Sequence, residues 1–185
     1  GVEAMPSVTY LDAGGEPLPA ERADEAAYSR YHLTVRADAR YQPHPAFART
    51  DDGAPRYRFD DPAEGRRYRQ IGDFAHTGSR PVRAEDYAYA IKRLADPEAG
   101  SPMIGFMGRY IVGMEALTAE LGDAPRDGWL DLRDFDLAGV EVLDDRNYTI
   151  TINGRYPQFV YWLAMHFFSP VPAEVDAFFH NPGFT

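Results

Sequence analysis

Three pairs of adjacent carboxylates are the residues of this chain most suited to acid–base chemistry. They are Asp51-Asp52, Asp60-Asp61 and Asp144-Asp145. Hydrolases that use two carboxylates hold them apart, on either side of the bond that is cleaved. Adjacent Asp residues near Gly, Pro and Asn are instead typical of exposed turns. We therefore interpret the three pairs as turn residues. A hydrolase that uses an Asp or Glu pair is a minor alternative.

The other reactive side chains do not form a recognisable catalytic or metal-binding pattern. The histidines show no spacing typical of zinc ligands; they are His32, His44, His76, His166 and His180. The chain has 0 Cys, which excludes a disulfide framework and a Cys nucleophile. Gly105-Phe-Met-Gly108 is not followed by the Gly-Lys-Ser/Thr of a phosphate-binding loop. We therefore expect no catalytic residues, no metal and no cofactor, and a protein that is not an enzyme.

Length and charge restrict the class of partner. A chain of 185 residues can form one domain, and we predict a single domain over 1–185. A net charge of −10 disfavours nucleic acid and anionic membrane surfaces, which both attract clustered Lys and Arg. The longest apolar run, residues 159–168, is too short to span a bilayer, so we expect no direct membrane insertion.

The clearest element is a helix over residues 84–95. Apolar residues recur at helical spacing, namely Tyr87, Ala90, Ile91 and Leu94. The first turn carries the acidic residues Glu85 and Asp86, and the last turn carries the basic residues Lys92 and Arg93. Pro97 then ends the helix. Further helices are predicted over 113–121, 157–166 and 172–179.

Alternating residues predict strands over 28–35, 139–143 and 148–153. Asp12-Ala-Gly-Gly15 is a hairpin-like turn signal between residues 8–11 and 17–19. Residues 50–68 are rich in Asp, Gly, Pro and Arg without periodicity, and we interpret them as a surface excursion within a loop insertion over 50–79. The predicted fold class is α+β, with a small mixed or antiparallel sheet and helices packed beside it.

The segment from Arg80 to Met103 also resembles a known family. Family 5 extracytoplasmic solute-binding proteins, the oligopeptide and dipeptide receptors of ABC importers, carry a Val-Thr-Ala-x-Asp-x-x-Tyr-x-x-x-Arg-Leu-x-Asp-Pro…Ser-Pro run. Ten residues match it in register: Val82, Ala84, Asp86, Tyr89, Arg93, Leu94, Asp96, Pro97, Ser101 and Pro102. Residues 137–152 resemble the family's Gly-Val…Asp-Asp hairpin, and residues 157–172 its turn that ends in Pro-Val-Pro. The resemblance covers roughly residues 80–184, with a further match at 28–45.

The chain departs from the family's pattern in three respects. Gln42-Pro-His-Pro45 replaces the Phe-His-Asp-Gly turn, and the long insertion follows it. Arg83 replaces the Thr that would begin a capping box, so the first amides of the helix need another partner. The family's proteins are also much longer than this chain, which looks like an excised part of one.

The resemblance implies a receptor with two lobes that close around a ligand and deliver it to an ABC permease in the membrane. It implies a fold like the first-lobe subdomain of dipeptide-binding proteins and a periplasmic or other extracytoplasmic location. Gly1 to Ser7 do not form a signal peptide, so we expect that signal to lie outside this chain. The ligand is a peptide or another small solute, since related receptors also take nickel complexes, haem or sugars.

We expect this chain to act as a scaffold and as one wall of the ligand cleft. The candidate ligand-binding residues are Met103, Phe106 and Tyr110, because the corresponding loop, 101–110 here, lies toward the binding side in the family. Packing within the lobe is the alternative role for these three side chains. A ligand-sensing or interaction domain of a regulatory protein is the alternative function.

Overall fold

The computed structural model describes residues 1–184, and within them four strands form one antiparallel sheet in the order β1-β2-β4-β3. The strands are β1 (Ser7–Leu11), β2 (Tyr28–Thr34), β3 (Val140–Val142) and β4 (Asn147–Asn153). The helices are α1 (Pro62–Gly65), α2 (Ala84–Ala95), α3 (Ile104–Tyr110), α4 (Met114–Asp123), α5 (Phe159–Trp162) and α6 (Ala173–Phe179). The predicted α+β class is confirmed.

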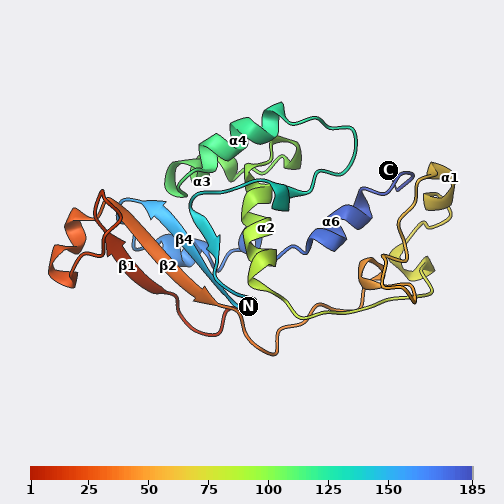
Figure 1. The fold of residues 1–185 in the computed structure, drawn as a ribbon, viewed down its shortest axis with the longest axis horizontal. Coiled ribbons are helices and arrows are strands. Elements are labelled where there is room, and N and C mark those ends of the chain that lie inside the picture. Colours follow the sequence, from red (N-terminus) through yellow and green to blue (C-terminus); the bar gives the residue numbers. More distant parts are fainter. Residues whose placement is uncertain (185) are drawn as a thin grey trace.

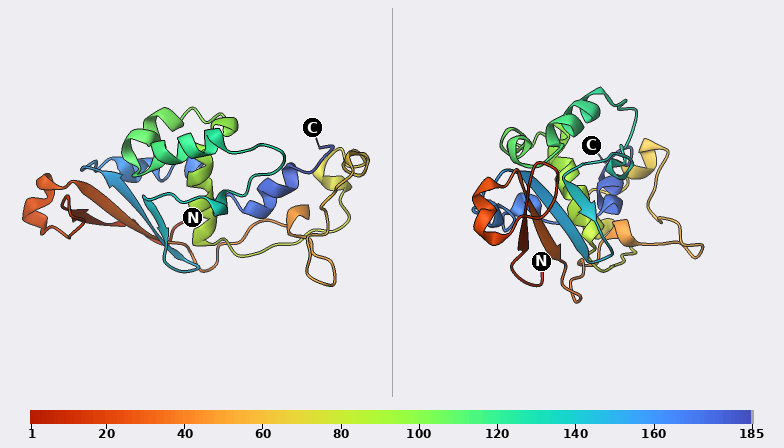
Figure 2. Two further views of the ribbon diagram at one scale, coloured as in Figure 1. Left: turned by 45° about the horizontal axis from the view of Figure 1, so that its top comes forward. Right: turned by 60° about the vertical axis from the view of Figure 1, so that its left-hand side comes forward.

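The molecule is elongated, with the sheet at one end and the 50–79 segment at the other (Figure 1). Helices α3 and α4 lie together beside the sheet, as further views confirm (Figure 2). Helix α6 connects the two ends, and the C-terminus lies near α1.

The main core lies on one face of the sheet. Tyr31 pairs with Ile150, and Leu33 pairs with Tyr148, so these four buried side chains point the same way. The Tyr87 ring of α2 stacks on Tyr148 with ring centroids 5.2 Å apart. The alternation predicted for strands 28–35 and 148–153 therefore identifies the core face correctly.

Helix α2 spans the residues that the sequence predicts, Ala84–Ala95. The Asp86 amide, which a Thr at position 83 would cap, donates instead to the Arg83 carbonyl at 3.1 Å. Two neighbouring amides also have acceptors. The Ala84 N–H donates to the Asp145 carbonyl at 2.8 Å, and the Arg83 N–H donates to the Asp86 carboxylate at 2.8 Å. The start of α2 is thus joined to the turn between β3 and β4.

The prediction of a loop over 101–110 is wrong, because α3 begins at Ile104. Met107 and Ile111, one helical turn apart, are both buried against the main core. This burial outweighs the low helix propensity of Gly105 and Gly108, which obscured the helix in the sequence.

The helix predicted over 157–166 is much shorter than expected. Helix α5 covers only Phe159–Trp162, and a 3-10 turn follows at His166–Phe168. The backbone of Met165 is extended, with φ −79° and ψ 151°. This break turns Phe168 into the main core, where it meets Phe159 edge-on.

The turn at Asp12–Gly15 is confirmed, since the Asp12 carboxylate accepts from the amides of Gly14 and Glu16. The chain returns antiparallel across this turn, since the Asp12 amide donates to the Glu16 carbonyl at 2.9 Å and the Leu18 amide to the Tyr10 carbonyl at 2.8 Å. This return is short, with one bridge between Leu11 and Pro17, and the longer pairing of β1 is with β2. Prolines at 17 and 19 have no N–H to donate, which limits the number of backbone hydrogen bonds that this return segment can make.

A second aromatic cluster lies where the 50–79 segment meets α6. Phe74 and Phe178 are buried at its centre, and their rings meet at 5.1 Å. Tyr57, Phe59, Tyr68 and Phe184 surround them. The interpretation of residues 50–68 as a surface excursion is right for their charged side chains and wrong for these aromatic ones.

No helix within residues 1–184 is both long enough and apolar enough to cross a membrane.

Candidate functional site

The predicted site residues lie together along α3. Met103 precedes the helix, and Phe106 and Tyr110 follow on its surface, all three partly buried against the main core. The Phe106 ring lies 4.6 Å from that of Trp162, and Tyr110 stacks on Tyr156 at 4.7 Å. We call these five residues the α3 aromatic surface.

The α3 aromatic surface is fixed to the fold at two points. The Tyr156 carbonyl accepts from the Tyr31 hydroxyl of β2 at 3.0 Å, which ties the surface to the sheet. Within the surface, the Tyr156 hydroxyl accepts from Trp162 Nε1 at 3.3 Å. Met107 anchors α3 from the opposite side, in the main core. Sequence analysis missed Tyr156 and Trp162, although the aromatic-rich residues flanking Pro157 were a usable signal.

The α3 aromatic surface can bind apolar or aromatic groups. It consists of ring faces, one thioether and tyrosine hydroxyls. Rigid aromatic side chains lose little conformational entropy when they bind a ligand, and they dominate many binding sites. Tyr161, on the neighbouring helix α5, is 71% exposed and extends the aromatic character of this region.

Several residues of the family-like run have structural roles. Asp86, 3% exposed, accepts two hydrogen bonds from the Arg80 guanidinium at 2.7 and 2.9 Å. The same guanidinium binds the Glu174 carboxylate of α6 through two bonds of 2.7 Å. Burial tends to raise the pKa of Glu174, but the bonds from Arg80 lower it below its ordinary value. Arg80 therefore joins α2 to α6.

A second junction lies further along the same two helices. The Asp176 carboxylate of α6 accepts from the Tyr89 hydroxyl at 2.6 Å and from Trp129 Nε1 at 3.0 Å. Burial and this bond to Asp176 both raise the pKa of Tyr89. At the end of α2, Asp96 accepts from the Glu98 amide and from Arg126. These family-like residues hold the scaffold together.

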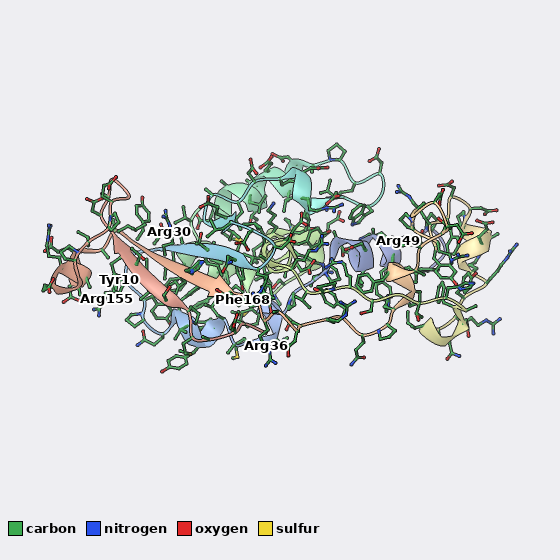
Figure 3. The ribbon with its side chains drawn as sticks, turned by 60° about the horizontal axis from the view of Figure 1, so that its bottom comes forward. Tyr10, Arg30, Arg36, Arg49, Arg155 and Phe168 are labelled. Carbon is green, nitrogen blue, oxygen red and sulfur yellow. The ribbon has the colours of Figure 1, made fainter. Side chains whose placement is uncertain are left out.

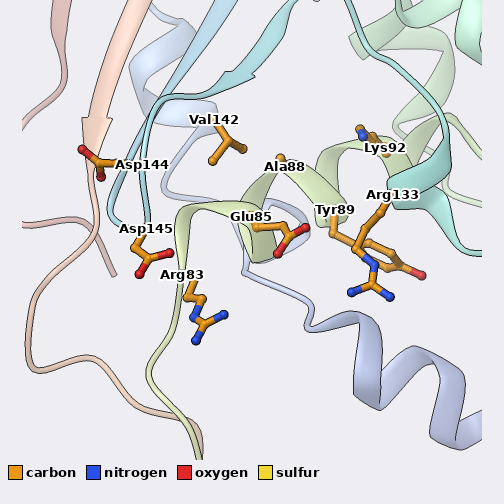
Figure 4. A pocket seen from close by; sticks show the side chains of 9 residues that line it. All are labelled: Arg83, Glu85, Ala88, Tyr89, Lys92, Arg133, Val142, Asp144 and Asp145. Carbon is orange, nitrogen blue, oxygen red and sulfur yellow. The ribbon is translucent and has the colours of Figure 1, made fainter.

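A pocket of about 330 Å³ lies between the start of α2 and the turn between β3 and β4 (Figure 4). Charges of both signs line it. Burial lowers the pKa of Lys92, while Arg133 is held by Asp131 at 2.5 Å. Asp144 also lines this pocket and accepts from the amides of Arg146 and Asn147. Much of the hydrogen-bonding capacity of Asp144 is therefore used within the protein.

A larger pocket of about 480 Å³ lies between the 50–79 segment and α6. We call it the α6 pocket. Its lining includes Arg49, Tyr57, Arg58, Asp127, Trp129 and Phe178. These residues come from three distant segments of the chain, and sequence analysis did not associate them.

The carboxylate pairs have the turn roles expected from the sequence. Asp52 accepts from the Thr50 hydroxyl, and Asp61 caps α1 by accepting from the Ala63 amide at 2.8 Å. Within residues 1–184, no three His, Asp or Glu side chains converge as a metal site would require. His44 is packed against Phe178, and its Nδ1 accepts from the Ala46 amide at 3.1 Å.

No family model and no curated protein matches the chain. Among solved structures, it is similar to the substrate-binding domain of an oligopeptide ABC transporter from Bacillus anthracis, at 20% identity and TM-score 0.44, covering 92% of this chain and 24% of that one. It is similar to the Escherichia coli murein tripeptide binding protein MppA, at 19% identity and TM-score 0.45, covering 89% and 24%. It is also similar to Listeria monocytogenes OppA bound to peptide, at 17% identity and TM-score 0.43, covering 92% and 25%.

The chain spans about a quarter of the length of these structures.

Proposed function

We propose that this chain is part of an extracytoplasmic substrate-binding protein that delivers peptides or similar solutes to an ABC importer. Its role is binding rather than catalysis. The observation that carries the proposal is the run of ten residues from Val82 to Pro102 that matches the family's pattern in register. So many matches at fixed spacing, across a helix, its cap and the following turn, are a poor fit to chance.

Within that protein, this chain supplies a scaffold and one wall of the ligand cleft. The scaffold is the main core together with the Arg80 and Asp176 junctions between α2 and α6. The wall is the α3 aromatic surface, with Met103, Phe106 and Tyr110 as the ligand contacts. Its attachment to Tyr31 and to the main core supports this role, because a fixed aromatic surface needs little rearrangement to bind.

The partners follow from the same proposal. A peptide or another small solute is the ligand, and an ABC permease in the membrane receives it through the full-length protein. The net charge of −10 disfavours nucleic acid as a partner. The site of action is the periplasm or the equivalent extracytoplasmic space. The single-domain organisation over 1–185, with 50–79 as an insertion, is part of the proposal.

The test is calorimetric titration of a mixed di- to pentapeptide pool into this chain and into its full-length parent. We expect the parent to bind and this chain to bind weakly or not at all, because most of the receptor lies outside it. Micromolar peptide binding by this chain alone that Phe106→Ala abolishes would contradict the scaffold role. If the parent binds no peptide, peptides are contradicted as the ligand class.

Variants of the parent then test the wall. Phe106→Ala and Tyr110→Ala each remove ring area from the α3 aromatic surface, and we expect each to weaken peptide binding about tenfold. Phe179→Ala is the matched control, since Phe179 is an aromatic residue 51% exposed on α6, away from that surface. Equal peptide affinity in all three variants would show that the α3 aromatic surface is not part of the binding site.

A further inference from the structure

The α6 pocket has walls from three segments of the chain. Residues 45–60 form one wall, residues 127–133 a second, and residues 173–182 of α6 and the chain after it a third. Figure 3 labels Arg49 where the first wall lies beside α6. The volume of about 480 Å³ is in the range of small-molecule sites. None of the five residues of the α3 aromatic surface lines it, so the two sites are separate.

The wall that carries Tyr57 and Phe59 is held by specific contacts. The side chain of Asn181, 7% exposed, accepts from the Phe59 amide at 2.9 Å and donates to the Tyr57 carbonyl at 3.0 Å. It thus pairs with this extended segment as a neighbouring strand would. A polar side chain this buried, with its donors and acceptors used, fixes the backbone around it.

Close backbone crossings hold the same region. A Cβ at Gly65 would lie 2.2 Å from the Pro182 carbonyl oxygen, and a Cβ at Gly183 would lie 2.2 Å from that of Pro62. Only glycine allows these two approaches between α1 and the C-terminal residues. The α6 pocket is therefore largely formed before any ligand binds.

Some charges in the α6 pocket are already used within the protein. Glu174 receives two bonds from Arg80, and Arg133 is paired with Asp131. Arg49 approaches Glu174 only at 3.9 Å. Arg58 and Asp127 have no ion-pair partner within 4.0 Å among residues 1–184. Asp60, also on the first wall, has none among those residues either. The first wall thus offers a ligand Arg49, Arg58 and Asp60, and the second wall offers Asp127.

Aromatic side chains complete the lining. Phe178 is buried in the second aromatic cluster and closes the inner side, while Trp129 stands on the second wall with its Nε1 bound to Asp176. The bond to Asp176 fixes the orientation of the indole ring. A ligand between Tyr57 and Trp129 therefore meets aromatic groups together with charges of both signs.

We propose that the α6 pocket binds a small zwitterion that carries an aromatic ring, either a free aromatic amino acid or a short peptide. Arg49 and Arg58 bind its carboxylate, Asp127 binds its ammonium group, and the ring packs against Trp129 and Phe178. This site goes beyond the cleft wall proposed on α3, and it does not depend on transport. Part of its first wall comes from the 50–79 segment, which the family-like pattern lacks.

Four probes with the same ring test the charge pattern by calorimetry or by NMR titration of this chain. Phenylalanine keeps both charges, and N-acetylphenylalanine keeps only the carboxylate. Phenylalanine amide keeps only the ammonium group, and N-acetylphenylalanine amide keeps neither charge. Phenylalanine should bind tightest, and each blocked charge should weaken binding about tenfold, as the loss of a charged hydrogen bond predicts. Equal binding by the doubly blocked probe, or no binding by any of the four at several millimolar, would overturn the proposal.

Two variants assign the charges. Arg49→Gln should weaken probes that keep the carboxylate and leave phenylalanine amide unchanged. Asp127→Asn should weaken probes that keep the ammonium group and leave N-acetylphenylalanine unchanged. Arg67→Gln and Asp51→Asn are controls, because both residues are exposed in the same region and do not line the pocket. Variants that weaken all four probes equally, or none, would contradict the assignment.

The remaining arms separate the two ligand sources and the two sites. Tighter binding of alanyl-phenylalanine than of phenylalanine assigns the pocket to peptides, and the reverse assigns it to free amino acids. Phe106→Ala should leave phenylalanine affinity unchanged, since Phe106 belongs to the α3 aromatic surface. Loss of phenylalanine binding in that variant would place the ligand on α3 and overturn the proposal for the α6 pocket. That result is independent of whether the transport proposal holds.

Discussion

The main core and the second aromatic cluster are built in different ways. The main core gathers side chains at regular spacing from β2, β4, α2 and α4. The backbone there is satisfied within the helices and between paired strands. The second cluster gathers rings from a segment with little regular structure. There, side chains satisfy the backbone: Asn181 pairs with the Tyr57–Phe59 segment, and the Tyr57 hydroxyl accepts from the His76 amide.

This difference teaches which part of the chain should open first. Backbone bonds within a sheet or helix break cooperatively with the whole core, whereas bonds to single side chains can be lost one region at a time. We therefore expect the second cluster to open locally while the main core stays folded. The junctions at Arg80 and Asp176 join the two regions through α6.

The sharpest contrast comes from matched truncations in the two regions. Phe74→Ala and Ile150→Ala each remove a buried side chain, at a cost of about 3 to 5 and 2 to 5 kcal/mol respectively. Ile150→Ala should lower the midpoint of global thermal unfolding. Phe74→Ala should instead expose residues 50–79 to limited proteolysis with a much smaller change in that midpoint. Equal midpoint shifts and equal protease resistance would show a single cooperative core.

The next effect is expected at the junction between α2 and α6. Asp86→Ala removes a partner of the partly buried Arg80 and the acceptor of the Arg83 amide, so it should destabilise the protein by about 3 kcal/mol. Asp38→Ala is the control, because the Asp38–Arg36 pair is exposed and should contribute little to stability. Chemical denaturation measures both. Similar losses would mean that the Arg80 junction does not link the regions energetically.

A smaller effect is expected from Asn181→Ala. It leaves the Phe59 amide and the Tyr57 carbonyl without this partner, at about 1 to 3 kcal/mol of local stability. Hydrogen exchange should speed up at residues 57–59 and 178–181 and stay unchanged in β2 and β4. Faster exchange in the sheet would contradict the separation of the two regions.

Mild acid should give the smallest effect, again in the second cluster. Burial lowers the pKa of His44, so its contribution to stability is complete above the ordinary histidine pKa of about 6.5 and is lost as the pH falls below it. Glu174, whose pKa is also lowered, loses its contribution at lower pH, as the pH falls through its folded pKa. Proteolysis of residues 50–79 should therefore rise below about pH 6.5. His44→Gln should remove the upper part of this dependence, while the exposed-site control His76→Gln should keep it.

The sequence predicted the elements whose signals agree locally. Helix α2 has an apolar stripe, charges that suit its dipole and Pro97 beyond its end, and its bounds were predicted correctly. Helix α3 was missed because Gly105 and Gly108 masked the spacing of Met107 and Ile111.

The candidate sites were less predictable, for a physical reason. The family resemblance indicated Met103, Phe106 and Tyr110, but Tyr156 and Trp162 join them only through tertiary contacts. The α6 pocket brings together residues 45–60, 127–133 and 173–182, and no local pattern links segments so far apart. The rings of the second aromatic cluster have no period, so nothing in the sequence marked them as buried.

The central claim is that α2 and the main core form a scaffold while the α3 aromatic surface contacts the ligand. The most direct test is hydrogen exchange of the full-length parent with and without a bound peptide. We predict new protection in residues 103–110 and 156–162, with α2 unchanged. Peptide binding that leaves α3 unprotected, or that protects only residues 45–60 and 173–182, would contradict the claim.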